Sequence, residues 1–199
     1  MTTKIPATAA IEKGPLTLTG ALNIPNSLTL LRILLIPVFV GLLVYRHYDY
    51  ALGALLVAGL TDALDGTIAR VANQRTELGA YLDPLADKLL LTTGFITLSV
   101  LGLAPLWVVI LVVSRDLILM TGTLLVRLTD SAVDLSPTTL GKGTTLLQLT
   151  YVLLVVALTS RRMDVHLLDP LLFTAAGLTL ASGLHYLYRG CTQLHAWDA

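Results

Sequence analysis

Cysteine is almost missing from this sequence, which contains only Cys191. A lone cysteine excludes a disulfide within the chain, a CxxC redox pair and a zinc site built from several thiolates. Redox chemistry that depends on paired thiols is therefore not expected.

Charged residues are also few. They make up 13% of the 199 residues, whereas soluble domains contain roughly 25%. Apolar residues make up 55% of the chain, and its mean hydropathy is +0.78. A chain of 21.3 kDa is too small to bury so many apolar side chains away from water, which excludes a water-soluble globule. The composition predicts an integral membrane protein.

An excess of charge of either sign is absent as well, because 13 basic and 13 acidic residues give a formal net charge of +0. No overall field would attract a nucleic acid, so we expect no nucleic-acid partner. Any electrostatic function has to come from a local group of charges.

Six apolar runs follow one another along the chain, each long enough for a membrane-spanning helix of about 20 residues. They cover residues 28–44, 50–69, 81–103, 106–126, 144–158 and 168–187. The sequence therefore predicts an all-α fold with six transmembrane helices in the lipid bilayer.

The segments outside these runs are short. Residues 1–22 contain no apolar run long enough for a signal peptide, and we expect a cytosolic tail there. The turn formers in Asn23-Ile-Pro-Asn26 predict a short interfacial helix or elbow along the membrane surface. The membrane domain is expected to cover residues 23–188, and residues 189–199 are expected to form a C-terminal tail.

Basic residues are distributed unevenly between the two sides of this topology. One side carries Lys4, Lys13, Arg70, Arg75, Arg127, Lys142 and Arg189, and the other carries Arg46, Arg161 and Arg162. Because the side richer in Lys and Arg is normally cytoplasmic, both termini are predicted to lie in the cytoplasm.

Five acidic residues lie within or at the ends of the apolar runs, where a carboxylate costs about 2.5–3.5 kcal/mol. They are Asp62, Asp65, Asp83, Asp87 and Asp116. On the second run Asp62, Asp65, Gly66 and Ala69 have the spacing of one helix face, and on the third Gly79, Asp83 and Asp87 repeat every four residues. The short linker between these runs predicts antiparallel neighbours whose two stripes meet near the cytoplasmic surface.

Four converging carboxylates would repel one another unless cations were present. Oxygen ligands without Cys or His nearby favour Mg²⁺ or Mn²⁺, and two carboxylates on each helix can support two ions. Such a pair of ions would clamp the oxygens of a pyrophosphate during an in-line displacement, and Arg70 would add a fixed cation to the same phosphates.

The two stripes form the pattern Asp62-x2-Asp65-Gly66-x2-Ala69-Arg70-x8-Gly79-x3-Asp83-x3-Asp87. This pattern resembles the signature of the CDP-alcohol phosphotransferase family with every fixed position filled, and the resemblance covers the chain from Asn23 to about Tyr188. It implies six transmembrane helices, usually a homodimer, and transfer of a phosphatidyl group from CDP-diacylglycerol to an alcohol with release of CMP. It also implies an active site on the cytoplasmic side of the membrane. In a bacterium this would be the inner membrane.

The resemblance also assigns roles by motif position. Asp62, Asp65 and Asp83 look like metal ligands, and Asp87 looks like a ligand that also acts as the general base. Gly66, Ala69 and Gly79 resemble the small residues that line the cytidine-diphosphate pocket.

Two cations outside the motif are further candidates. Arg115 interrupts the fourth run and Lys142 precedes the fifth, and both resemble family residues that bind a phosphate of the acceptor or the lipid. The alternatives are a private ion pair with an acid for Arg115 and a snorkelling interfacial lysine for Lys142. Arg32, near the start of the first run, is interpreted as an interface anchor.

The acceptor is the finer question. Two cations suit an acceptor that carries a phosphate, and the amino-terminal segment looks like that of the family members that use glycerol 3-phosphate to make phosphatidylglycerophosphate. The alternative is a cardiolipin synthase that uses phosphatidylglycerol, because Ser114-Arg115-Asp116 and Asn73-Gln74-Arg75 look at least as much like that enzyme.

Other classes of function remain as alternatives. The acids also fit a divalent-cation carrier or channel, although its carboxylates should spread along a pore instead of clustering at one end. A buried ion-pair network that only joins helices, within a structural scaffold, is a third alternative, and close helix packing is a second role for Gly66, Ala69 and Gly79.

Overall fold

The computed structural model describes residues 24–71, 77–128 and 139–195, and these are almost entirely α-helical. The long helices are α2 (Ile24–Val44), α3 (Tyr48–Val71), α4 (Glu77–Val100), α5 (Leu106–Leu128), α6 (Thr139–Ser160) and α7 (Asp169–His195), and a short 3-10 helix, η1 (Val165–Leu168), precedes α7. No strand occurs in the described ranges. The predicted all-α fold is confirmed.

Each of the six predicted apolar runs coincides with one long helix, but the ends differ. The clearest difference is α7, which runs to His195 although its apolar run ends at residue 187. Hydropathy detects the part of a helix that suits lipid, whereas backbone hydrogen bonding continues beyond it into more polar sequence. The predicted C-terminal tail therefore begins as helix.

The segment predicted as an elbow belongs to helix α2 instead. Ile24, Pro25 and Asn26 form the first turn of α2. Proline is tolerated in a first helical turn because its missing N–H would have no partner there. Asn23 and the residues before it lie outside the described part of the chain, so an interfacial helix ahead of Ile24 stays a prediction.

Four segments among the described residues are long and apolar enough to cross a membrane: Ser27–Val44, Leu106–Thr123, Leu140–Ser160 and Val165–Arg189. The remaining long helices, α3 and α4, carry the acids of the motif, which interrupt their apolar sequence. These findings agree with an integral membrane protein, and the count of six spans stays a prediction.

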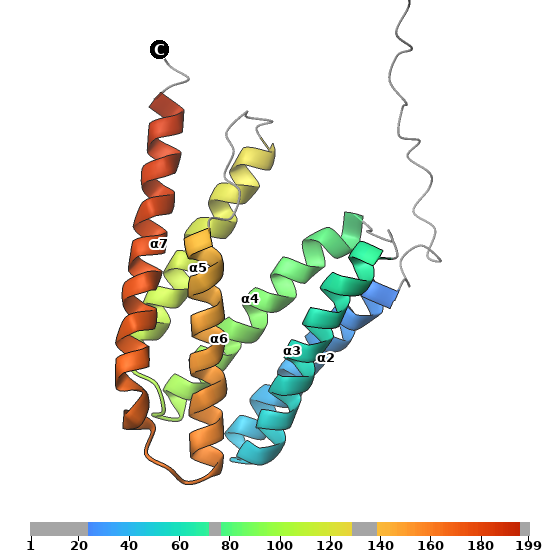
Figure 1. Cartoon of the computed structure of the whole chain (residues 1–199), viewed down its shortest axis with the longest axis vertical. Helices are drawn as coiled ribbons and strands as arrows, with labels where there is room; N and C mark the ends of the chain where they lie inside the picture. The colour runs from blue at the N-terminus through green and yellow to red at the C-terminus, as the bar shows by residue number, and fades with distance from the viewer. Residues whose placement is uncertain (1–23, 72–76, 129–138, 196–199) are drawn as a thin grey trace, which may run out of the picture.

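The helices run up and down, as Figure 1 shows. Helix α2 packs against α3 and α4, α5 packs against α7, and α6 packs against α3 and α7. The start of α2 and the end of α7 point toward the same end of the molecule, which is uppermost in Figure 1. The connections α2–α3, α4–α5 and α6–η1 lie at the opposite end, which we call the loop end.

The apolar core lies toward the loop end. Phe39, Phe95 and Val155 are at most 1% exposed there, and Phe95 stacks on Tyr151 with 5.9 Å between ring centroids. Aromatic stacking of this kind adds to the gain from burial. The core thus joins α2, α4 and α6 at the end away from the acids of the motif.

The outer surface of the bundle is apolar as well. On α2, Leu30, Leu34 and Val38 recur every four residues and are all more than half exposed, whereas Arg32 is completely buried. A charged residue buried inside and an apolar face exposed outside are the reverse of a soluble helix and match a helix surrounded by lipid.

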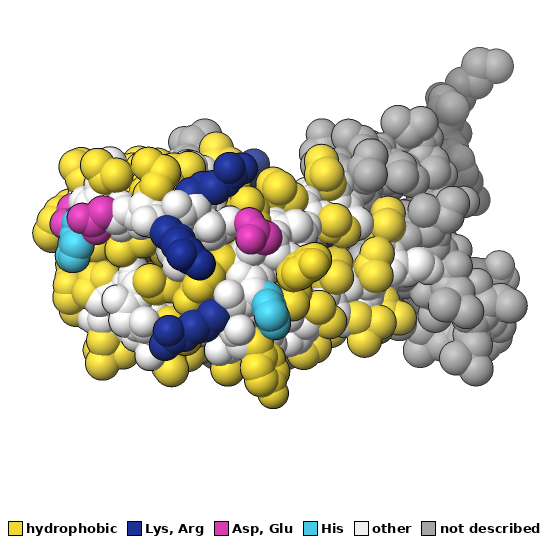
Figure 2. All heavy atoms as spheres, turned by 90° about the horizontal axis from the view of Figure 1, so that it is seen from below, with side chains coloured by type: hydrophobic (Ala, Val, Ile, Leu, Met, Phe, Trp, Pro, Cys, Tyr) yellow, Lys and Arg dark blue, Asp and Glu magenta, His cyan; other side chains and the backbone are white. Residues whose placement is uncertain are grey.

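Three helices end at the loop end with the same hydrogen-bonded cap. In α2 the N–H of His47 donates to Leu42 O, and matching bonds run from Leu103 N to Leu98 O and from Met163 N to Leu158 O. Each cap has one residue in the left-handed conformation. These residues are Arg46 (φ 60°), Gly102 (φ 74°) and Arg162 (φ 55°), in the same order. The three caps are Schellman caps, which satisfy carbonyls that the helix leaves open. Figure 2, a view of this end, shows Lys and Arg side chains surrounded by apolar ones.

Candidate metal and substrate site

Arg32 joins two acids of the motif. Its Nη2 lies 2.8 Å from Asp62 Oδ1, and its Nη1 lies 2.7 Å from Asp87 Oδ1. The three residues come from α2, α3 and α4, so one guanidinium connects three helices. The interpretation of Arg32 as an interface anchor is wrong, because its side chain is 0% exposed.

The two carboxylates are much more accessible than the cation that holds them. The side chain of Asp62 is 51% exposed and that of Asp87 is 43% exposed. The guanidinium therefore lies on the inner side and the carboxylates on the outer side of this group. A hard cation can approach the carboxylate oxygens from outside. Such oxygens are the donors that Mg²⁺ and Mn²⁺ prefer.

The other motif residues are placed on helices only. Asp65, Gly66, Ala69 and Arg70 lie on α3, and Gly79 and Asp83 lie on α4. The helical spacing used to assign them to shared faces is thus present, but their side chains lie outside the described part. Among the side chains that are described, no group of three or more potential ligands gathers. The four-carboxylate metal site remains a prediction. Of its four acids, the structure brings Asp62 and Asp87 together.

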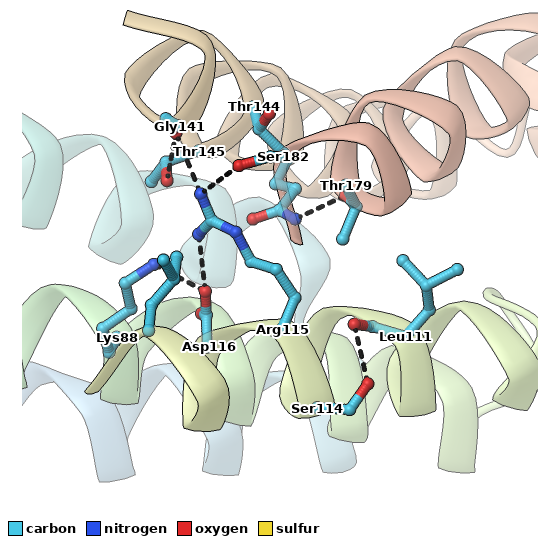
Figure 3. A network of polar contacts seen from close by, with 12 residues as sticks. Lys88, Leu111, Ser114, Arg115, Asp116, Gly141, Thr144, Thr145, Thr179 and Ser182 are labelled. Atoms are coloured by element: carbon cyan, nitrogen blue, oxygen red, sulfur yellow. Dashed lines mark hydrogen bonds and ion pairs between the residues drawn. The ribbon is translucent and has the colours of Figure 1, made fainter. Parts of the chain in front are cut away.

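Figure 3 shows a second group of charges, formed by Lys88, Arg115 and Asp116. Asp116 Oδ1 lies 2.7 Å from Lys88 Nζ and 2.7 Å from Arg115 Nη1. Arg115 and Asp116 are each 4% exposed. Lys88 follows Asp87 directly in α4, so consecutive residues serve the two groups.

Arg115 also makes contacts beyond α5. Its Nη2 donates to Ser182 Oγ at 3.1 Å and to Gly141 O at 3.3 Å, which connects α5 to α7 and α6. Its Nε and Asp116 Oδ2 have no hydrogen-bond partner among the described residues. An ion pair with an acid is the alternative that the sequence leaves open for Arg115, and the structure contains it. This ion pair uses only one nitrogen of the guanidinium, and a second nitrogen contacts Ser182 and Gly141.

Among the described side chains, Lys88 and Arg115 share the single carboxylate of Asp116, so this group carries one more positive than negative charge. Since a charge in a low-dielectric environment is costly without a counter-ion, this group favours an additional anion. Lys142 is exposed in the first turn of α6, one residue after the carbonyl that Arg115 contacts. The fold therefore places Arg115 and Lys142 in one neighbourhood.

Polar side chains also join α6 to α7. Gln148 Nε2 donates to Thr179 Oγ1 at 2.9 Å, and both residues are 0% exposed. Thr179 Oγ1 in turn donates to Ala175 O at 2.6 Å. Interhelical hydrogen bonds of this kind hold membrane helices in register. They keep Ser182, one turn beyond Thr179, next to Arg115.

A shallow groove between α5 and α7 reaches Arg115. It has a volume of about 120 Å³, and Leu111, Ile118 and Leu184 line it together with Arg115. Its walls are otherwise mainly apolar, so it suits a hydrocarbon chain better than a sugar or a base.

Charged residues inside apolar runs were the signal for both groups. Asp62, Asp87, Arg115 and Asp116 were recognised by that signal, whereas Arg32 and Lys88 were given no site role. An intramembrane Arg or Lys is a functional candidate on the same grounds. Arg32 is near the start of its apolar run, and this position favours the interpretation as an interfacial residue.

The fold and these charges define a helical membrane protein with an acidic motif and buried arginines within its bundle. A family model described as CDP-alcohol phosphatidyltransferase matches residues 22–184. The chain belongs to this family, and the expectation drawn from its motif is confirmed.

Several named proteins are similar in sequence. A CDP-diacylglycerol–glycerol-3-phosphate 3-phosphatidyltransferase of Bacillus subtilis is 36% identical over 195 residues, covering 89% of this chain and 96% of that protein. A human cardiolipin synthase (CMP-forming) is 44% identical over 106 residues, which are 53% of this chain and 35% of the human protein. A putative cardiolipin synthase of Mycobacterium bovis is 37% identical over 131 residues, or 65% of this chain and 62% of that protein. The similarity to the last two thus spans less than two thirds of their length.

Proposed function

We propose that this protein is a metal-dependent phosphatidyltransferase of phospholipid biosynthesis. It moves the phosphatidyl group of CDP-diacylglycerol to the hydroxyl of an alcohol and releases CMP. The observation that carries the proposal is the meeting of Asp62 and Asp87 at Arg32, with both carboxylates half exposed, in a chain whose motif fills every position of the family signature.

The proposed metal ligands are Asp62, Asp65, Asp83 and Asp87, which would hold Mg²⁺ or Mn²⁺, with two ions in each active site. The described carboxylates fit such an ion, since they supply oxygen donors and are accessible from outside. Bound metal would neutralise the negative charge that develops on the phosphates as CMP leaves.

Asp87 is proposed as the general base. It takes the proton of the acceptor hydroxyl while the acceptor oxygen bonds to the β-phosphorus and the bond from that phosphorus to the bridging oxygen breaks, so that CMP leaves with the bridging oxygen. Gly66, Ala69 and Gly79 leave room for the cytidine diphosphate on the facing stripes of α3 and α4. Arg70 would add a cation to its phosphates.

Arg115 and Lys142 are proposed to bind a phosphate of the acceptor. The excess positive charge around Asp116 and the contact of Arg115 with Gly141, next to Lys142, support this assignment. Our first choice of acceptor is glycerol 3-phosphate, because the Bacillus subtilis relative that carries this reaction in its name aligns over 89% of the chain. The second is phosphatidylglycerol, which the relatives named cardiolipin synthase support.

We also propose the setting of the enzyme. Six helices span a bacterial inner membrane, both termini and the active site are cytoplasmic, and the protein functions as a homodimer. The shared direction of the start of α2 and the end of α7, with the smaller group of arginines at the loop end, supports this orientation.

The test is CMP release by the full chain purified in detergent with Mn²⁺ or Mg²⁺ and CDP-diacylglycerol. Glycerol 3-phosphate, phosphatidylglycerol, inositol phosphate and serine are supplied in turn. We expect glycerol 3-phosphate to stimulate CMP release and a labelled phosphatidylglycerophosphate to form. The Asp87→Asn variant, which keeps an oxygen that can accept from Arg32, should release no CMP with any acceptor.

Each alternative gives a different result. Stimulation by phosphatidylglycerol and not by glycerol 3-phosphate would replace the first choice by cardiolipin synthesis. No transfer to any acceptor, together with Mn²⁺ flux into proteoliposomes that requires Asp62, would favour the cation carrier instead.

A further inference from the structure

We propose that Arg32 is a built-in counter-cation, a positioning residue that holds Asp62 and Asp87 ready for the metal and substitutes for part of the metal's charge when no ion is bound. The inference rests on the proposed function, because it takes both acids as metal ligands. It adds a residue outside the acidic motif to the site.

The geometry supports a positioning role first. The two carboxylates belong to α3 and α4, and Arg32 belongs to α2, which packs against both. Two different nitrogens of one guanidinium contact one Oδ1 each, at 2.8 Å for Asp62 and 2.7 Å for Asp87. The planar fork fixes the separation of the two oxygens, which the single ammonium group of a lysine would not do. Arg32 therefore sets how far apart α3 and α4 hold their acids.

The electrostatics explain why a cation is needed here. Two carboxylates side by side inside a membrane protein repel each other, and a completely buried guanidinium without an acid is equally unfavourable. Each charge is thus stabilised by the other group. Because Asp62 and Asp87 are still half exposed on the outer side, a metal ion can add to them without displacing Arg32 from the inner side.

A distinct consequence follows for stability. Bound metal stabilises the native state of any variant that binds it. The wild-type protein already has one counter-cation in the chain, so its unfolding temperature should depend less on metal than that of a variant without Arg32. Without Arg32, the two acids lose the cation that joins them, and the metal should supply part of the lost positive charge. A residue that only fills space would not link stability to metal in this way.

The experiment compares unfolding temperatures of the full chain in detergent, after chelation and again with excess Mn²⁺, followed by tryptophan fluorescence. Without metal, Arg32→Gln should lower the unfolding temperature by on the order of 10 °C, as expected for a broken buried ion pair. Mn²⁺ should restore at least half of that loss and shift the wild type far less. Without metal, the unfolding temperature of Arg32→Lys should lie between those of the wild type and Arg32→Gln.

Gln148→Met is the matched control, since Gln148 is another completely buried polar residue whose bond to Thr179 lies away from both acids. It should lower the unfolding temperature equally with and without Mn²⁺. If Arg32→Gln cannot be purified without metal, it is purified in Mn²⁺ and then stripped, and Arg32→Lys is measured in parallel.

Two results would overturn the proposal. The first is an equal loss in Arg32→Gln with and without Mn²⁺, while the electron paramagnetic resonance signal of free Mn²⁺ shows that wild type and variant both bind it. The second is no loss at all. Failure of wild-type protein to bind Mn²⁺ in the same resonance measurement would instead remove the proposed metal site, and this inference with it.

Discussion

Asp87 and Lys88 are neighbours in the sequence, yet their side chains enter different groups of charges. Asp87 meets Arg32, and Lys88 meets Asp116. Successive residues of a helix point about 100° apart, so one turn of α4 can serve partners on both sides. The acids proposed to bind metal and the cations proposed to bind an acceptor phosphate are thereby connected through neighbouring residues of α4.

The motif predicted its own residues but not their partner. The spacing of Asp62 and Asp87 follows from the period of a helix and a short linker, so their helices could be predicted to be neighbours. Arg32 lies on another helix, and no spacing rule connects it to the motif. Which acid pairs with which cation is decided by helix packing, and that information is not present in local sequence patterns.

Arg115→Lys separates acceptor binding from a purely structural ion pair. Lysine can keep the contact with Asp116, but it loses the second nitrogen that bonds Ser182 and Gly141. We expect the acceptor KM to rise about tenfold, as for loss of a hydrogen bond to a charged group, while the KM of CDP-diacylglycerol changes less than about twofold.

Steady-state CMP release with each substrate varied in turn measures both constants. Arg46→Lys, at the loop end, is the control and should leave both unchanged. Equal changes in the two constants for Arg115→Lys would show that Arg115 does not distinguish the acceptor.

At the scale of the helices, the sequence predicted which segments are helical better than where they end. Apolar runs located all the long helices of the described ranges, because lipid imposes a minimum length on each span. The predicted end of α7 and the predicted start of α2 are wrong for different reasons. The polar continuation of α7 has no hydropathy signal, and Pro25 was interpreted as a turn former although it also suits a first helical turn.

The contact of α5 with α7 depends on Gly122. A Cβ at this position would lie 2.5 Å from Tyr186 Oη and 2.9 Å from its Cε1, closer than real contacts allow. Gly122→Ala should therefore push the Tyr186 ring away and destabilise the protein by about 1–3 kcal/mol, as overpacking does. The measured unfolding temperature should fall by about 5 °C.

Gly177→Ala on α7 is the matched control, because a Cβ there would meet no atom within 4 Å. It should be neutral or slightly stabilising, since alanine favours a helix more than glycine does. Adding Tyr186→Leu should recover part of the loss caused by Gly122→Ala. An unfolding temperature that is unchanged in Gly122→Ala would show that the two helices approach less closely than described.

At the scale of the whole molecule, two groups of polar contacts meet at consecutive residues of α4. Arg32 of α2 contacts Asp62 of α3 and Asp87 of α4. The next residue, Lys88, contacts Asp116 of α5, which pairs with Arg115, and Arg115 reaches Gly141 of α6 and Ser182 of α7. Every long helix of the described ranges contributes to these contacts. The predicted fold class gave the helices, but this connectivity emerged only from their packing.

The orientation of the whole protein can be measured with single cysteines. Native Cys191 follows the end of the last apolar segment at Arg189, and Arg161 lies exposed at the loop end. In bacterial spheroplasts, a membrane-impermeant maleimide should label a Cys191→Ser/Arg161→Cys variant directly. It should label Cys191 of the wild type only after permeabilisation. The Cys191→Ser protein is the control without label, and the reverse pattern would overturn the proposed orientation.

The packed loop end limits how far the site can change shape. Hydrogen-bonded caps at Arg46, Gly102 and Arg162 end three helices there, and the apolar core fills the space between the helices. A ligand that changes the gap between Asp62 and Asp87 therefore has to move α3 or α4 against this core and against Arg32 of α2, which contacts both carboxylates.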